Sequence, residues 1–95
     1  MNWQVYIIRC SDDSLYTGIT TDLQRRLALH AGQRGARYFY GRKPERVVYL
    51  ESGHTRSSAS RREAAIKHLE REHKLRLIAS PDNEIDRHPQ AIRCP

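Results

Sequence analysis

The chain has 95 residues, of which 38% are hydrophobic, and it carries a formal net charge of +6 at pH 7. This length fits one domain, and a chain of this size buries only about 60 to 70% of the surface that it exposes when unfolded. Its apolar runs fall short of the ~20 residues that a membrane-spanning helix needs. These values exclude a second domain, a membrane span and a deep cavity, so a site should be shallow. Because the start does not resemble a signal peptide, we expect a cytoplasmic protein.

Arginine dominates the positive charge, since 14 of the 17 basic residues are Arg. The guanidinium group is a planar fork that binds phosphate at two points, whereas the Lys ammonium is a strongly hydrated point charge. Seven basic residues and a single acidic one, Glu45, give residues 23–46 the same +6 as the whole chain. This patch predicts a polyanionic partner, most commonly nucleic acid, although a merely basic surface is the alternative. The seven are Arg25, Arg26, Arg34, Arg37, Arg42, Lys43 and Arg46.

The cysteines and histidines predict no metal framework. Cys10 and Cys94 are the only cysteines and form no CxxC motif, and one disulfide is not expected in a small chain without an export signal. His68 and His73 are five residues apart, which on a helix places them on different faces. A zinc site is therefore not expected.

The first twenty residues predict a β-hairpin. Trp3–Cys10 and Leu15–Ile19 are rich in β-branched and aromatic residues, and the polar segment between them has the composition of a turn. If the loop holds an odd number of residues, Ile8 pairs with Tyr16, and Tyr6 lies diagonally from Tyr16 on the same face. An even loop would place the tyrosines on opposite faces. The alternative to a shared role is two half-buried tyrosines with hydroxyls in water.

The rest of the chain predicts helices around a third strand, and hence an α/β (α+β) fold of order β-β-α-β-α-α. Residues 1–80 should form the domain, and the polar, proline-containing stretch 81–95 a loosely attached or disordered tail. The expected elements are a helix from a Thr21 cap to Gly32, a basic loop over Gly32–Pro44, a strand over Arg46–Leu50, a helix capped by Ser57, Ser58 or Ser60, and helical turns around Leu75, Leu77 and Ile78.

The positions of four residues in the predicted elements make them candidates for a functional site. Gly18 lies inside a predicted strand, where glycine costs stability, so another group should approach its backbone closely. Arg26 and His30 are four residues apart and share one helix face. Glu63 stands in an otherwise basic helix start, where it also fits a capping box with Ser60 and would by itself be an ordinary surface residue.

Together these residues resemble the GIY-YIG nuclease domain. The resemblance covers Trp3 to about Ile78 and rests on Val5-Tyr6-Ile7, on the run 15–27 and on a later helical glutamate. The chain looks most like the small, stand-alone YhbQ-like bacterial members. The resemblance implies a three-stranded antiparallel sheet flanked by helices, and cleavage of phosphodiesters with one divalent metal, Mg²⁺ or Mn²⁺.

The resemblance also implies roles for individual residues. Glu63 would be the metal ligand. Val5 stands where the family has Gly, Thr17 stands where Ile is usual, and Asn83 is the only Asn after Glu63. The implied catalytic residues are Tyr6, Tyr16, Arg26, His30 and Glu63. Contacts with nucleic acid are expected from Gly18, Arg25, Arg34, Arg37, Arg42 and Lys43.

Phosphodiester hydrolysis needs a deprotonated water, a cation beside the developing charge and help for the leaving oxygen. A tyrosine with a pKa of about 10 is a poor base, so Tyr6 would need positive charge from the metal or Arg26 to accept a proton. Tyr16 and His30 would orient the water or the leaving group, and the sequence does not choose between these roles.

We therefore expect a metal-dependent endonuclease that acts on DNA or structured nucleic acid, with a place in DNA repair. The main alternative is a nucleic-acid-binding module of the same fold that cleaves poorly or not at all. A less favoured alternative is a partner-binding domain that the basic loop merely keeps in solution. Specificity would rest on a protein partner or on nucleic-acid shape.

Overall fold

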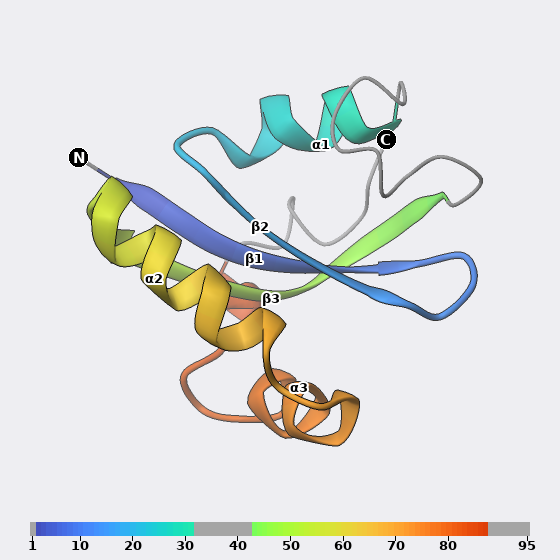
Figure 1. The fold of residues 1–95 in the computed structure, drawn as a ribbon. Coiled ribbons are helices and arrows are strands. Elements are labelled where there is room, and N and C mark those ends of the chain that lie inside the picture. The colour runs from blue at the N-terminus through green and yellow to red at the C-terminus, as the bar shows by residue number, and fades with distance from the viewer. Residues whose placement is uncertain (1, 32–42, 88–95) are drawn as a thin grey trace.

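A three-stranded antiparallel sheet with the strand order β2-β1-β3 forms the centre of the molecule (Figure 1). The computed structural model describes residues 2–31 and 43–87, and of residues 30 and 31 only the backbone. The elements are β1 (Trp3–Cys10), β2 (Leu15–Thr20), α1 (Leu23–Ala31), β3 (Pro44–His54), α2 (Arg56–Lys67), α3 (Arg71–Ile78) and the 3₁₀ helix η2 (Ile85–Arg87). This confirms the predicted fold class and the order β-β-α-β-α-α.

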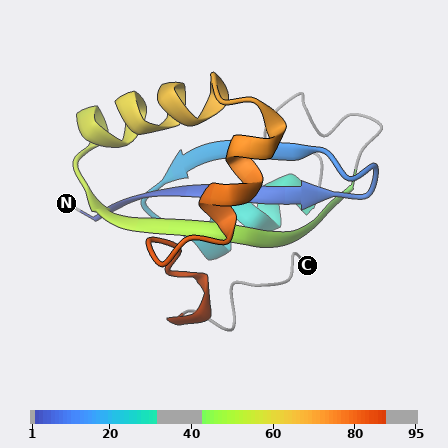
Figure 2. The same ribbon diagram turned by 90° about the horizontal axis from the view of Figure 1, so that it is seen from below.

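The sheet is covered on both faces, by α1 on one and by α2 and α3 on the other (Figures 1 and 2). Because successive side chains of a strand point to opposite faces, the central strand β1 contributes to both cores. The core on the α1 face contains Tyr6, Ile8, Cys10, Leu23, Leu27, Val47 and Leu50, and the core on the α2 face contains Val5, Ile7, Tyr49, Ala59 and Ile66. Among the described residues, no helix is both long and apolar enough to cross a membrane.

The β1–β2 hairpin has an odd loop. The Cys10 amide donates to the Ser14 carbonyl at 2.9 Å, which leaves residues 11–13 as the loop. Asp13, with φ 68°, supplies the left-handed residue that three-residue hairpin loops need. In this register Ile8 lies opposite Tyr16, and Tyr6 lies opposite Gly18. The sequence argument that places both tyrosines on one face is thereby confirmed.

The helix starts differ from those predicted. Helix α1 is capped by Asp22 rather than Thr21, since the Asp22 Oδ1 atom accepts a hydrogen bond from the Arg25 amide at 3.2 Å. Helix α2 is capped by Thr55, in a capping box with Ser58. The proposed caps at serines 57, 58 and 60, and a box between Ser60 and residue 63, are therefore wrong.

The end of β3 explains the displaced cap of α2. Strand β3 continues to His54 instead of ending at Leu50. Gly53 adopts a φ of 79°, and the β1–β3 register shifts between Trp3 and Val5. An irregularity of this kind lets a strand absorb an extra residue without ending. The glycine therefore marks a bulge inside the strand, and the following Thr55 becomes the first residue free to cap a helix.

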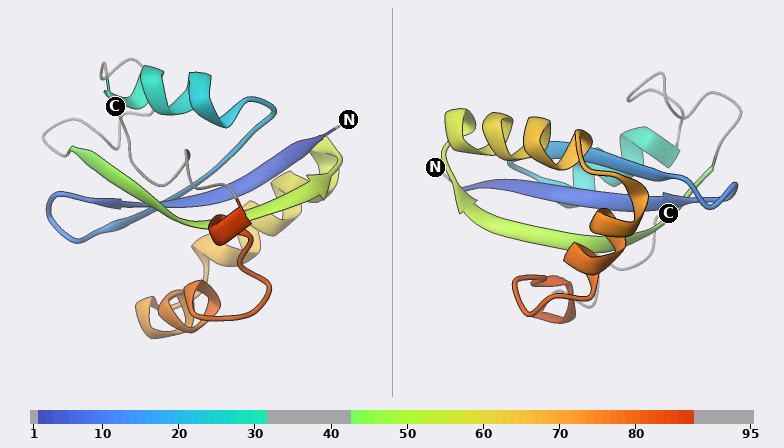
Figure 3. Two further views of the ribbon diagram at one scale, coloured as in Figure 1. Left: turned by 180° about the vertical axis from the view of Figure 1, so that it is seen from behind. Right: turned by 60° about the horizontal axis from the view of Figure 1, so that its bottom comes forward.

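The chain after Pro81 is bound to β3, so the expectation of loose attachment is wrong for residues 83–87. The Asn83 amide nitrogen donates to the carbonyls of Val48 and Ile78, both at 2.8 Å. Its oxygen accepts from the amides of Leu50 at 3.2 Å and Ile85 at 3.0 Å. Figure 3 shows this segment against β3. The polar composition of this stretch did not predict the attachment, which rests on the hydrogen bonds of Asn83 and Glu84 and on Ile85 packed against the core on the α1 face.

Glu84 continues the attachment along the same strand. Its amide donates to the Leu50 carbonyl at 2.9 Å, and its carboxylate accepts from the Ser52 amide at 2.9 Å and the Ser52 hydroxyl at 2.6 Å. Together the two side chains bind backbone groups over three alternate residues of β3.

We predict that Asn83→Ala lowers the free energy of unfolding by about 1 to 3 kcal/mol, because it leaves part-buried backbone groups unpaired. Asp82→Ala, at the exposed neighbouring position, is the matched control and should change stability by less than about 0.5 kcal/mol. Urea unfolding measures both. Equal effects of the two substitutions would contradict a structural role for Asn83.

Candidate active site

Two tyrosines from adjacent strands lie together on the face that α1 covers. The ring centroids of Tyr6 and Tyr16 are 6.3 Å apart, with an angle of 49° between the ring planes. Tyr6 is fully buried, whereas Tyr16 at the outer strand β2 is only partly buried. The two phenols therefore have different access to water.

The Tyr6 ring lies directly against the backbone of Gly18. A β-carbon added at Gly18 would lie 2.5 Å from the Tyr6 hydroxyl oxygen and 2.6 Å from its Cζ atom. It would also come within 3.1 Å of a ring carbon of Tyr16. The close approach expected at this glycine comes from within the protein, from the Tyr6 phenol.

Arg26, on α1, lies close to both tyrosines. The charge of its guanidinium group acts on the hydroxyls of both Tyr6 and Tyr16 and opposes the rise of their pKa values. The Nε atom of Arg26 is buried and has no hydrogen-bond partner among the described residues. Arg26 thus presents a positive charge beside the phenols and retains one donor that the described protein leaves unsatisfied.

Electrostatic effects connect Glu63 of α2 to the same group. Burial raises the pKa of Tyr6 well above its usual range, and the charge of Glu63 adds to this while Arg26 opposes it. Burial also raises the pKa of Tyr16, against the lowering effects of Lys67 and Arg26 and with a further rise from Glu63. Four of the predicted catalytic residues, Tyr6, Tyr16, Arg26 and Glu63, are therefore close enough to influence one another.

Lys67 is a member of this group that the sequence reasoning missed. Its Nζ atom lies 3.3 Å from the Glu63 carboxylate, one helical turn away. The i, i+4 spacing of Glu63 and Lys67 was the signal that could have identified it.

The donor set fits a hard divalent cation held by a single protein carboxylate. No group of three or more His, Cys, Asp or Glu side chains suited to a metal occurs among the described residues. Mg²⁺ commonly binds one or two carboxylates and completes its shell with waters and substrate phosphates. The Glu63 side chain, 24% exposed, is placed to offer one such oxygen ligand.

The other predicted residues are distributed around this centre or lie outside the described residues. Arg25, beside Arg26, lines a shallow depression at the start of α1 with Thr20, Thr21, Asp22 and Leu29. Lys43 is exposed, and its backbone is hydrogen-bonded to Ser11 next to the hairpin loop. The side chain of His30, and residues Arg34, Arg37 and Arg42 entirely, fall outside the described parts of the chain.

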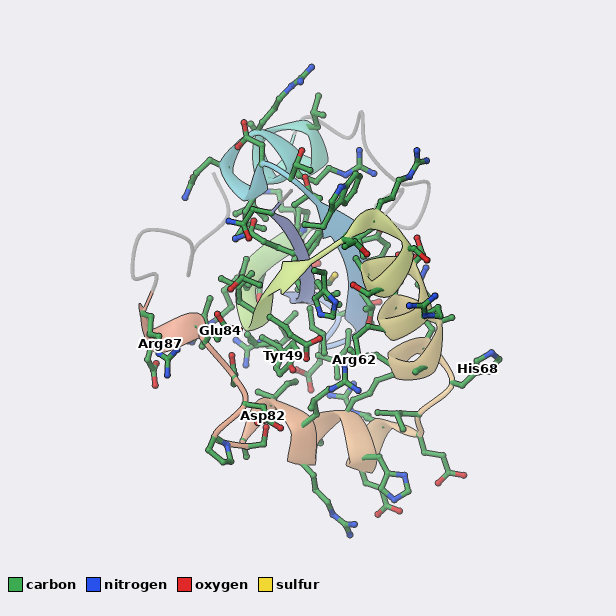
Figure 4. The ribbon with its side chains drawn as sticks, turned by 90° about the vertical axis from the view of Figure 1, so that its left-hand side faces the viewer. Tyr49, Arg62, His68, Asp82, Glu84 and Arg87 are labelled. Atoms are coloured by element: carbon green, nitrogen blue, oxygen red, sulfur yellow. The ribbon has the colours of Figure 1, made fainter. Side chains whose placement is uncertain are left out.

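A second polar cluster fixes α2 against β3 (Figure 4). The Tyr49 hydroxyl donates to the Glu51 carboxylate at 2.6 Å, and the Arg62 Nε atom donates to both Glu51 oxygens at 3.2 Å. His54 contacts the same carboxylate and also Ser58. Burial alone would raise the pKa of Glu51, but these hydrogen bonds and the Arg62 charge outweigh it and lower that pKa. Since Arg62 adjoins Glu63, the cluster anchors the turn of α2 that carries the candidate metal ligand.

We predict that Gly18→Ala displaces the Tyr6 ring, because its β-carbon would overlap the phenol. The expected cost is about 1 to 3 kcal/mol of stability, as in other overpacked cores. Shifts of the Tyr6 and Tyr16 ring signals in NMR spectra measure the displacement. Gly53→Ala is the control for ring position: its φ of 79° makes the substitution cost stability as well, but no atom lies within 4 Å of the added carbon, so both rings should stay unchanged.

Comparison with known proteins gives a consistent result. The model of the GIY-YIG catalytic domain matches residues 2–76. The chain is 46% identical over 81 residues to a UPF0213 protein of Desulfotalea psychrophila, covering 84% of this chain and 74% of that protein. It is 51% identical over 73 residues to a UPF0213 protein of Haloquadratum walsbyi, covering 77% of this chain and 82% of the relative.

A solved structure is similar as well. The solution NMR structure of a UPF0213 protein from Bacillus halodurans matches with a TM-score of 0.54 and 44% sequence identity. The match covers 83% of this chain and 84% of that one. The similarity therefore extends over both the sequence and the arrangement of the described elements.

Proposed function

The chain belongs to the GIY-YIG catalytic-domain family, and we propose that it is a metal-dependent endonuclease that hydrolyses phosphodiester bonds in DNA or structured nucleic acid. The observation that supports this most strongly is the convergence of Tyr6, Tyr16, Arg26 and Glu63 from four different elements. A protein that only bound nucleic acid would gain nothing from a carboxylate at this place, because negative charge repels phosphates.

Glu63 would hold the divalent cation, Mg²⁺ or Mn²⁺, with waters and a substrate phosphate as further ligands. When bound, this cation would supply positive charge beside the scissile phosphate and lower the pKa of a coordinated water. A single carboxylate binds such a cation weakly without substrate. The Arg62–Glu51 contact supports this role, because it limits the movement of the neighbouring Glu63.

Arg26 would stabilise the charge that develops on the phosphate oxygens. Its Nε atom is buried without a partner among the described residues, so the contact with a phosphate oxygen would come from the part of Arg26 that lines the depression at the start of α1. A guanidinium group whose Nε atom is buried has limited freedom to move, so it needs little reorganisation when charge develops.

Tyr16 suits the role of proton acceptor better than Tyr6. Tyr6 is fully buried with a raised pKa, which favours a protonated hydroxyl that donates a hydrogen bond. Burial raises the pKa of Tyr16 as well, but Tyr16 is partly exposed and the positive charges of Lys67 and Arg26 oppose the rise. We therefore assign to Tyr16 the activation or orientation of the attacking water, and to Tyr6 the support of Arg26.

Nucleic acid would approach over the start of α1, where Arg25 and Arg26 line one depression. Backbone phosphates are the groups that such arginines bind, and they carry no sequence information. Selection of a target would then come from nucleic-acid shape or from a protein partner.

We predict that Glu63→Gln abolishes metal-dependent cleavage, with a loss of several orders of magnitude. DNA binding should stay level or tighten, because a negative charge near the phosphates is removed. The assay is incubation with single-stranded, duplex, flapped and branched DNA and with RNA, with and without Mg²⁺ or Mn²⁺. Glu72→Gln, at an exposed position in α3, is the matched control and should cleave as the wild type does.

Equal and metal-insensitive cleavage by the wild type and Glu63→Gln would mean that the activity is a contaminant. Binding without metal-dependent cleavage of any of these substrates would instead support the nucleic-acid-binding module.

A further prediction separates the two tyrosines. Tyr16→Phe should lower the cleavage rate by about 10² to 10⁴, the range for losing a general acid or base, and should flatten the rise of rate with pH. Tyr6→Phe should cost less and leave the shape of the pH profile unchanged, because Tyr6 acts through Arg26. Rates measured from pH 6 to 10 under single-turnover conditions test this, and a flattened profile for Tyr6→Phe alone would reverse the assignment.

A further inference from the structure

The mechanism described above uses Glu63 as the metal ligand and the Lys67 charge at Tyr16, but gives no role to the ion pair between Glu63 and Lys67. The two charged groups are 3.3 Å apart, with side-chain exposures of 24% for Glu63 and 52% for Lys67. On an ordinary helix surface such a pair would only add a little helix stability. Here the negative partner is the candidate metal ligand, so the ammonium group lies close to where a cation would bind.

The helix that carries the pair also lies near β2, the strand of Tyr16. Helix α2 packs against β2 as well as β1. Among the positive charges that lower the pKa of Tyr16, Lys67 acts more strongly than Arg26. Lys67 therefore contacts Glu63 and is near enough to Tyr16 for its charge to act on that hydroxyl, and with 52% of its side chain exposed it is accessible to a bound polyanion.

We propose that Lys67 couples metal binding to nucleic-acid binding by exchanging partners. Without a cation, Lys67 neutralises Glu63, and when a divalent cation binds the carboxylate, the ammonium group turns to a backbone phosphate. This inference rests on the proposed function, because it requires Glu63 to bind metal and the surface to bind nucleic acid.

The electrostatic reason is that an ammonium group and a divalent cation cannot both stay close to one carboxylate without repelling each other. Because the metal must displace Lys67 from Glu63, the free protein binds metal more weakly. The released ammonium group then supplies an additional positive charge for phosphate. Linkage then requires that nucleic acid raise the metal affinity by the factor by which metal raises the nucleic-acid affinity. The metal site would fill mainly when substrate is present.

The chemistry of lysine suits this exchange. Its ammonium group is a point charge on a flexible stem with no fixed geometry, whereas arginine forms directional, bidentate contacts with carboxylates. Arg62, one residue before Glu63, shares its Nε–H group between both oxygens of Glu51 at 3.2 Å. Arg62 is thus held by this three-centre contact, whereas the exposed Lys67 can change partners.

The experiment measures both affinities on the full chain. Mn²⁺ binding is followed by EPR of the free ion, with and without a flapped DNA oligonucleotide whose phosphates carry phosphorothioate substitutions to slow cleavage. Binding of the same oligonucleotide is followed by fluorescence anisotropy, with and without Mn²⁺. The variants are Lys67→Met and, as a matched control with the same charge change on α3, Lys74→Met.

In the wild type, Mn²⁺ should tighten DNA binding, and DNA should tighten Mn²⁺ binding by the same factor. Lys67→Met should bind Mn²⁺ about two- to fivefold more tightly without DNA, the range for loss of a partly exposed ion pair. The coupling factor should fall by a similar amount. Lys74→Met should keep the wild-type coupling.

Two results overturn the proposal in different ways. If Glu63→Gln abolishes Mn²⁺ binding but Lys67→Met keeps the wild-type metal affinity and coupling, the partner exchange is wrong and the proposed function stands. If the wild type binds no Mn²⁺ with or without DNA, the proposed function fails and the exchange fails with it.

Discussion

The contact between the Tyr6 phenol and the Gly18 backbone is the constraint on which the rest of the site depends. It is possible only because residue 18 has no β-carbon and because the three-residue loop places Tyr6 opposite it. The same register places Tyr16 diagonally across from Tyr6, and the Arg26 charge acts on both hydroxyls. A change of one residue in the hairpin loop would move one tyrosine to the other face and dismantle the group.

The site draws on both sides of the sheet. Tyr6 belongs to the core beneath α1, whereas Glu63 lies on α2, which covers the opposite face. The outer strand β2 separates these helices, and charged residues of both helices shift the pKa of its partly exposed Tyr16. The position of α2 relative to β2 therefore matters for chemistry as well as packing, and the contact of Arg62 with Glu51 helps to fix it.

Local patterns predicted much of this arrangement. Strand parity reduced the question to the number of loop residues: an odd loop places Tyr6 and Tyr16 on one face and an even loop does not, and the loop has three residues. A glycine within a strand was enough to predict a close approach, although not the group that approaches. The Thr55 cap and the Asn83 contacts were not predictable in this way, since one depends on a bulge in β3 and the other on groups far apart in the chain.

The Asn83 and Glu84 contacts also determine how the sheet meets other molecules. An outer strand with free amide and carbonyl groups is a template to which another extended chain can add. On β3, groups of Val48, Leu50 and Ser52 that would receive such a chain are already hydrogen-bonded to Asn83 and Glu84. A short segment without strand structure thus closes this border of the sheet, and it protects the folded protein from edge-to-edge self-association there.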